Sequence, residues 1–262
     1  MKENFLQELD NIVLSNNVVD NFYNKYLKDK EFAFELDSII PQIKMCEVQQ
    51  QNNPWHKYNV LGHILHSVDA MNKMTRGMSD HDRRMLAYVM LLHDIGKPDC
   101  HIERIKDGVK IDSFFNHNVK SVEIARQILP NLGFSGGDVN VMLKLIYKHD
   151  IFMFIKEEKS SNPHWKVLTP ELVKSEINEL SSVGDGFKLM RFLVMVGRSD
   201  NYAQNEKMTG KSLKMLEKFE IIIKNLESSA IKWFLLMSMV HLLFKNFKFL
   251  WRASLWICED II

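Results

Sequence analysis

The sequence has no excess of charge of either sign and contains little cysteine. Lysine and arginine total 34 residues against 33 for aspartate and glutamate, so no global basic field attracts nucleic acid non-specifically. The three cysteines lack the spacing of a CxxC motif. In a chain of 262 residues they are typical of the reduced thiols of a cytosolic protein. We therefore expect a cytoplasmic protein.

Long hydrophobic runs are also missing. The longest, WFLLMSMVHLLF at Trp233–Phe244, is little more than half of the roughly 20 residues that a membrane span needs. The N-terminal stretch MKENFLQELDNIV is amphipathic and acidic, unlike a signal peptide. We expect no membrane partner, and we interpret the apolar run as a buried helix or one that faces a partner.

The sequence contains no internal repeat, no regular series of alternating strands and no phosphate-binding loop. The stretch GFSGGD, Gly133–Asp138, lacks the lysine and hydroxyl residue of such a loop and predicts a turn before a helix. Short β segments around Val109–Ile111 would be peripheral. The hydrophobic fraction of 46% allows a sizeable core in one large domain, or in one domain with an appendage.

Apolar residues recur instead at the spacing of amphipathic helices, which predicts an all-α protein. Arg84–Leu92 is a mostly apolar helix that we expect at the centre. Thr169–Glu171 predicts a helix start, because a capping hydroxyl precedes a proline and an acid. The remaining apolar stripes are Leu61, Ile64, Leu65, Val68 and Met71; Val119, Val122, Ala125, Ile128 and Leu129; Val139, Met142, Leu143 and Ile146; and Leu189, Phe192, Leu193 and Val196.

Several imidazoles and carboxylates fall on these apolar faces. His149 lies three residues after Ile146, and Asp200 lies four residues after Val196, so both belong to buried stripes. His93–Asp94 ends the central helix in the stretch LLHDIGKPD. A buried carboxylate is costly to desolvate without compensating charge. Metal ions supply that charge, and several divalent metals accept imidazole and carboxylate ligands together.

Each residue alone has a simpler interpretation, since a lone histidine on an apolar face is usually a hydrogen-bonded core residue. The ordered set favours metal binding. It resembles the HD-domain superfamily of metal-dependent phosphohydrolases, whose signature is H…HD…D, with two further histidines in members that hold two metals. LLHDIGKP is similar to the central motif, and FFNHNVKSVEIARQIL resembles the next helix of the dinuclear members. The matching residues are His63, His93, Asp94, His117, His149 and Asp200.

The resemblance is closest to the HD region of bacterial tRNA nucleotidyltransferases. CEVQQQNNPWHKYNVLGHILHSVDAM, Cys46–Met71, is similar to the entry of that region, and GRSDNYAQN, Gly197–Asn205, to the segment with its last aspartate. The nucleotidyltransferase head has no counterpart, so nucleotide addition is not expected. The resemblance implies an all-α HD-domain fold with a metal centre in its core. We expect the HD domain at residues 1–206 and a helical segment of unknown role at 207–262, which would cover the core, form a homodimer interface or be a loosely ordered tail.

The resemblance also implies a ligand set and a role for each residue. His63, His93, Asp94 and Asp200 would hold a first metal; Asp94 would bridge to a second metal, which His117 and His149 would also hold. The cofactors would be two divalent ions, with Mn, Ni, Mg, Fe, Co and Zn not distinguished. A bridging carboxylate keeps two ions about 3.5–4 Å apart, and such a pair activates water for attack on phosphorus.

Other polar residues near these motifs have less certain roles. Asp94 and Lys97 would be catalytic; Lys97, His66 and Arg198 would bind substrate. The alternative for Lys97 is a solvated lysine at a helix end, and for Arg198 it is a salt bridge elsewhere. His56 and His66 are secondary candidates: His66 would support a ligand or contact substrate, and either would otherwise be a surface residue. Asp150 would accept the second N–H of His149, as acceptors near metal-bound imidazoles do.

These residues predict a metal-dependent phosphohydrolase or phosphodiesterase that acts on a small phosphorylated substrate, such as a nucleotide or a 2′,3′-cyclic phosphate. The cyclic-phosphate class follows only from the resemblance. One alternative is a di-iron oxygenase of the same superfamily. Another is a non-catalytic module that binds RNA, although the complete ligand set and the near-neutral charge do not favour it.

Overall fold

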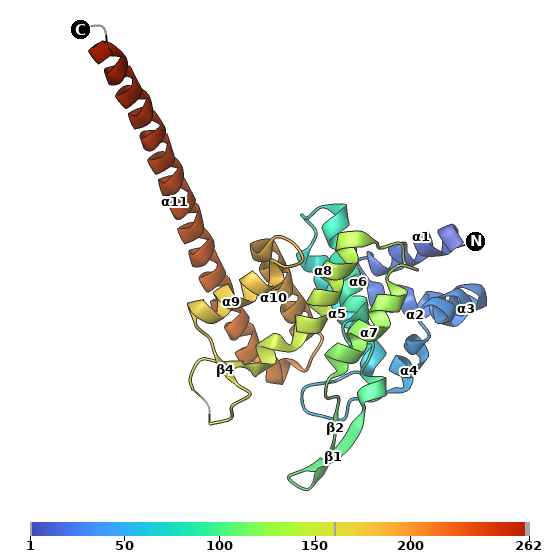
Figure 1. Cartoon of the computed structure of the whole chain (residues 1–262). Helices are drawn as coiled ribbons and strands as arrows, with labels where there is room; N and C mark the ends of the chain where they lie inside the picture. Colours follow the sequence, from blue (N-terminus) through green and yellow to red (C-terminus); the bar gives the residue numbers. More distant parts are fainter. Residues whose placement is uncertain (1, 160, 260–262) are drawn as a thin grey trace.

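The computed structural model of the chain describes residues 2–159 and 161–259, and this part of the chain is predominantly helical (Figure 1). The all-α prediction is therefore confirmed. The α-helices are α1 (Lys2–Val13), α2 (Val18–Lys28), α3 (Lys30–Ile39), α4 (Gln42–Val48), α5 (Val60–Met74), α6 (Asp80–Leu92), α7 (His117–Ile128), α8 (Gly136–Lys148), α9 (Pro170–Leu180), α10 (Gly186–Tyr202) and α11 (Glu206–Glu259); two short 3-10 helices are η1 (Pro98–Cys100) and η2 (His149–Phe154).

Two small sheets lie outside the helical bundle. Strands β1 (Ile102–Lys106) and β2 (Val109–Ser113) pair as an antiparallel hairpin, whereas β3 (Ile155–Lys156) and β4 (Lys166–Val167) pair in parallel. Most residues of the β1–β2 hairpin are exposed, which agrees with the prediction of peripheral strands near Val109–Ile111.

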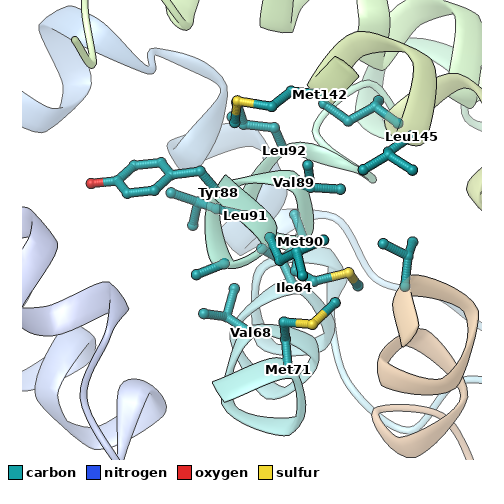
Figure 2. Close-up of a cluster of buried hydrophobic side chains, with 14 of the residues drawn as sticks. Ile64, Val68, Met71, Tyr88, Val89, Met90, Leu91, Leu92, Met142 and Leu145 are labelled. Atoms are coloured by element: carbon teal, nitrogen blue, oxygen red, sulfur yellow. The ribbon is translucent and has the colours of Figure 1, made fainter. Parts of the chain in front are cut away.

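Helix α6 is the central helix of the bundle. Ser79 caps its N-terminus by accepting a hydrogen bond from the backbone N–H of Asp82, and two aspartates in its first turn complement the helix dipole. Every residue in the run Met85–Leu92 is buried, as expected for a helix that is covered on all sides. Figure 2 shows the α6 side chains Tyr88–Leu92 packed between residues of α5 and α8, among them Ile64 and Met142.

Helices α5, α8 and α10 pack around α6 and against one another. The apolar stripes predicted for α5 and α10 are buried throughout. In the stripe predicted over α7, Val119 is an exception, because 41% of its surface is exposed. The Val119 side chain is open to solvent, although His117 in the same turn of α7 is buried. That part of the sequence prediction is therefore wrong, although the helix itself is present.

Helix α11 packs only its first turns on the bundle. Leu216, Phe219 and Ile223 are buried against α9, α10 and η2, with the Phe219 ring edge-on to Phe152 at 5.0 Å. Farther along, α11 projects away from the body (Figure 1), and the described side chains of Trp233 and Met237 are exposed. Most other side chains of the apolar run 233–244 lie outside those that the structure describes. Among the described residues, no helix has both the length and the apolar character required to cross a membrane.

Candidate metal centre

The first group of expected ligands lies where α5, α6 and α10 meet. The Nε2 atom of His63 lies 2.9 Å from Oδ1 of Asp200 and 3.1 Å from Oδ2 of Asp94. The Nε2 atom of His93 lies 3.6 Å from Oδ1 of Asp200 and 3.3 Å from Oδ2 of Asp94. All four side chains are buried, and one ligand atom from each lies within 4.8 Å of the others. The turn after α6 thus brings His93 and Asp94 to residues that come from two other helices.

The second group faces the other oxygen of Asp94. Its Oδ1 atom lies 3.1 Å from Nε2 of His117, at the start of α7, and 3.5 Å from Nε2 of His149, directly after α8. These atoms also lie within 4.8 Å of one another. The structure therefore brings all six sequence-predicted ligands together in two groups, and the carboxylate of Asp94 presents one oxygen to each group.

Backbone carbonyls orient three of the four imidazoles. The Nδ1 atoms of His93, His117 and His149 lie 2.6–2.7 Å from the carbonyl oxygens of Met90, Phe114 and Ile146. A carbonyl oxygen only accepts hydrogen bonds, so Nδ1 carries the proton in each ring. The Nε2 lone pair of each neutral ring then points into the centre, as in metal-bound histidines whose other nitrogen donates to a carbonyl.

The centre contains buried polar atoms that lack a hydrogen-bond partner within the described chain. These are Nε2 of His63, Nε2 of His93 and Oδ1 of Asp94, whereas Oδ2 of Asp94 is paired with Lys97. Buried polar atoms are nearly always hydrogen-bonded, and unpaired ones require an explanation such as an ion. Imidazole nitrogens and carboxylate oxygens are the donor set of divalent transition metals. The residues present therefore fit a divalent metal.

The electrostatic field at this centre favours positive charge. Burial disfavours the imidazolium form of His93, yet the charges of Asp94 and Asp200 raise its pKa to about 9. Burial likewise disfavours protonation of His117, but Asp150 and Asp94 raise its pKa to about 10. For Asp94 and Asp200, the neighbouring cations outweigh burial and hold the pKa well below its usual range. Protons and metal ions compete for such sites.

Lys97 lies beside the centre and is only 5% exposed, so the alternative of a solvated lysine is excluded. Its Nζ atom lies 2.6 Å from Oδ2 of Asp94, 2.9 Å from Oε1 of Gln51 and 3.0 Å from Nε2 of His56. Burial and the charge of Lys97 lower the pKa of His56 to about 2, so His56 is neutral and accepts a hydrogen bond from Lys97. Gln51 and His56 come from a loop, and nothing in their sequence spacing points to this contact.

Two residues predicted to bind substrate face elsewhere. Arg198 forms an ion pair with Glu220 of α11 at 2.9 Å. Two positions along a helix correspond to a rotation of about 200°, so Arg198 lies on the face of α10 opposite to Asp200. The alternative of a salt bridge is therefore what the structure shows. The ring of His66 stacks on Tyr58 at 4.1 Å and lines a separate surface cavity of about 220 Å³ beside Tyr202. Neither side chain contacts the His/Asp centre.

Asp150 also differs from its predicted role. The Nδ1 hydrogen of His149 goes to the carbonyl of Ile146, not to Asp150. The Asp150 carboxylate instead lies 3.1 Å from Nε2 of His117 and 3.2 Å from Nε2 of His149. Asp150 thus lies on the inner side of these imidazoles, and the expectation that it supports His149 from behind is wrong.

Comparison with known proteins shows what this part of the chain is similar to. Residues 60–181 match the HD domain, a range that contains five of the six expected ligands and ends before Asp200. Similar proteins include the bifunctional uridylyltransferase/uridylyl-removing enzymes of Nitrobacter hamburgensis, 24% identical over 99 residues, and Rhodopseudomonas palustris, 26% identical over 123 residues. The aligned parts are 38% and 42% of this chain but only 11% and 12% of those proteins.

HD domains are generally metal-dependent hydrolases that bind divalent metals, and the match at residues 60–181 shows that this part of the chain is similar to them. The closer resemblance to tRNA nucleotidyltransferases remains a prediction, since the relatives named above are uridylyltransferase/uridylyl-removing enzymes.

Proposed function

We propose that this chain is a metal-dependent phosphohydrolase that cleaves a phosphoester of the nucleotide or 2′,3′-cyclic phosphate class. The observation that supports this most is the position of Asp94 between two groups of inward-facing Nε2 atoms. His63, His93, Asp94 and Asp200 would hold one divalent ion, and Asp94, His117 and His149 a second. When bound, such a pair supplies activated water and neutralises charge on the phosphoryl oxygens.

The chain's own residues prepare this chemistry. The carbonyls of Met90, Phe114 and Ile146 hold a proton on Nδ1 of each ring and keep Nε2 facing inward. Lys97 adds a fixed positive charge beside Asp94. The three hydrogens of its ammonium group match three partners, so Lys97 reaches a substrate oxygen only by releasing one of them.

The substrate class draws further support from the similar proteins. Their names state that they remove a uridylyl group. A uridylyl group is a nucleotide attached through its phosphate, so its removal by water cleaves a phosphoester. We therefore propose the same type of bond for this chain, while the pocket residues that select the substrate stay undetermined by these names.

The test is a phosphoester screen with controlled metal loading. Protein stripped with a chelator is reloaded with Mn²⁺, Ni²⁺, Mg²⁺, Co²⁺, Zn²⁺ or Fe²⁺ and assayed on bis(p-nitrophenyl) phosphate, 2′,3′-cyclic AMP and nucleoside monophosphates. We expect metal-dependent turnover, reduced at least about 1000-fold by Asp94→Asn, because metal catalysis supplies several kcal/mol. Asp10→Asn is the matched control, since Asp10 contacts Arg84 and Tyr88 instead.

Two outcomes would overturn the proposal. Substrate-dependent oxygen uptake by the iron-loaded protein, without ester cleavage, would make it an oxygenase. RNA binding that persists in Asp94→Asn, again without ester cleavage by the wild type, would make it a binding module.

A further inference from the structure

Besides His81–Asp82 in the first turn of α6, the sequence contains two His–Asp pairs that are placed alike, His93–Asp94 and His149–Asp150. Each pair follows directly after the last residue of a helix, α6 ending at Leu92 and α8 at Lys148. Helices α6 and α8 pack against each other, and Oδ1 of Asp94 lies 3.5 Å from Nε2 of His149. The two pairs therefore meet at one centre, although only the first belongs to the signature in the sequence.

The Asp150 carboxylate contacts the metal-facing nitrogens of the second group. Its Oδ2 atom lies 3.1 Å from Nε2 of His117, and its Oδ1 atom lies 3.2 Å from Nε2 of His149. No lysine or arginine among the described residues lies within ion-pair distance of this carboxylate, whose side chain is only 15% exposed. Its only ion-pair contacts in the described chain are therefore with these two imidazoles.

Hydrogen bonds alone do not satisfy this arrangement. The Nδ1 atoms of His117 and His149 donate to backbone carbonyls, so Nε2 of each neutral ring is an acceptor. The two Nε2 atoms nevertheless face each other at 3.2 Å. Oδ1 of Asp94, buried and without a hydrogen-bond donor, faces the same point. With both rings neutral, four acceptor groups converge on one point, and a proton or a metal ion between them satisfies these groups.

We propose that Asp150 is a direct ligand of the second ion, an inference that rests on the dinuclear centre of the proposed function. The two half-sites then match in chemistry. His63, His93 and Asp200 form one, His117, His149 and Asp150 form the other, and Asp94 is shared. Two imidazoles with two carboxylates suit the same metal in both positions. With Asp150 as a ligand, three carboxylates in place of two offset the charge of the two divalent ions.

The sharpest test introduces a thiolate where the carboxylate lies. Asp150→Cys is loaded with Co²⁺, and its absorption spectrum is compared with that of the wild type. A thiolate bound to cobalt gives a charge-transfer band that imidazole and carboxylate ligands do not give. We expect this band in Asp150→Cys and not in the wild type or in Asp10→Cys, where the neighbours are Arg84 and Tyr88.

A second variant keeps the test decisive if the thiolate variant does not fold. Asp150→Asn is titrated with Mn²⁺ alone, and the number of bound ions is measured by calorimetry and elemental analysis. Replacing a residue behind a metal ligand costs about 10–100-fold in affinity, so loss of a direct ligand should weaken one ion by about 100-fold or more and leave the other unchanged. Thermal unfolding checks that the variant is folded.

The outcomes separate this inference from the function on which it rests. Wild-type protein that binds fewer than two ions at the centre would contradict the proposed dinuclear site itself. Two ions bound with wild-type affinity by Asp150→Asn, or a folded, cobalt-loaded Asp150→Cys without a charge-transfer band, would contradict only the role of Asp150.

Discussion

At the scale of single residues, local backbone geometry determines which ring nitrogen faces the centre. His93, His117 and His149 each direct Nδ1 to the carbonyl three residues earlier in the chain. This contact depends only on the turn that carries the histidine and not on the distant helices. Each ring is therefore oriented before the other ligands meet it, which lowers the cost of ordering the site.

Lys97 provides a prediction at this scale. Lys97→Met keeps the apolar stem but removes the ammonium group next to Asp94. We expect kcat/KM for a phosphoester to fall about 100-fold, the usual effect of losing one charge-stabilising donor. Bound metal should be retained or held more tightly, because a positive neighbour is removed. The control is Lys144→Met, whose ammonium pairs with Glu179; equal kcat/KM for both variants would show that Lys97 has no part in the chemistry.

The sequence predicts the six ligands but not their surroundings. Their identity follows from apolar stripes and an ordered motif, which are properties of single segments. Gln51 and His56 meet Lys97 only through the folding of a loop, so no periodicity points to them. The sequence did contain a signal for Asp150, because His149–Asp150 repeats the His–Asp dipeptide of the central motif. The imidazole nitrogen that Asp150 contacts depends on the turn after α8, which the sequence pattern does not reveal.

At the scale of elements, Gly96 allows α7 to pack closely on the turn that carries His93 and Asp94. A Cβ atom on Gly96 would lie 2.5 Å from the backbone nitrogen of Ser121 and 2.8 Å from the carbonyl carbon of Lys120. The backbone N–H of Gly96 donates to the Ser121 hydroxyl at 3.0 Å. The glycine therefore sets the distance between the two ligand-bearing segments, because α7 begins with His117.

Gly96→Ala tests this packing. The added methyl group collides with backbone atoms that cannot rotate away, so we expect a loss of about 1–3 kcal/mol in the free energy of unfolding. Displacement of α7 should also weaken the ion nearest His117 more than the other. Urea unfolding and metal titration measure both effects. Gly137→Ala, at the start of α8, has no atom within 4 Å of its added Cβ and should be neutral or slightly stabilising; similar losses in both variants would refute the packing role.

Element boundaries were predictable where capping chemistry is local. The Thr169 hydroxyl accepts from the backbone N–H of Leu172, and α9 starts at Pro170, as the sequence predicts. The exposure of Val119 was not predictable, because the helical period alone does not reveal how much of a face other elements cover. Helical spacing identifies an apolar face, but tertiary packing decides how much of that face is buried.

At the scale of the whole molecule, the HD domain at 60–181 does not contain the whole centre. Asp200 comes from α10, and α10 is covered in turn by the first turns of α11 through Leu216 and Phe219. The expected boundary at residue 206 stays a prediction. The packing nevertheless indicates that the segment up to about Ile223 supports the site, whereas the later part of α11 projects away from the body in Figure 1.

Two truncations separate these parts of α11. A chain that ends after residue 230 should bind metal and unfold like the full chain, because the described buried residues of α11 end at Ile223. A chain that ends after residue 205 loses the burial of Leu216 and Phe219, and should lose at least about 3 kcal/mol of stability. Chemical unfolding and metal analysis of both chains test this. Equal stability of the two would contradict a supporting role for the first turns of α11.

Anomalous X-ray diffraction from crystals of the Mn²⁺-loaded full chain tests the central claim most directly. The account predicts two anomalous peaks about 3.5–4 Å apart, one beside Nε2 of His63 and His93, the other beside Nε2 of His117 and His149, with Asp94 between them. Absence of manganese from this centre, at a metal concentration that supports phosphoester turnover, would contradict it.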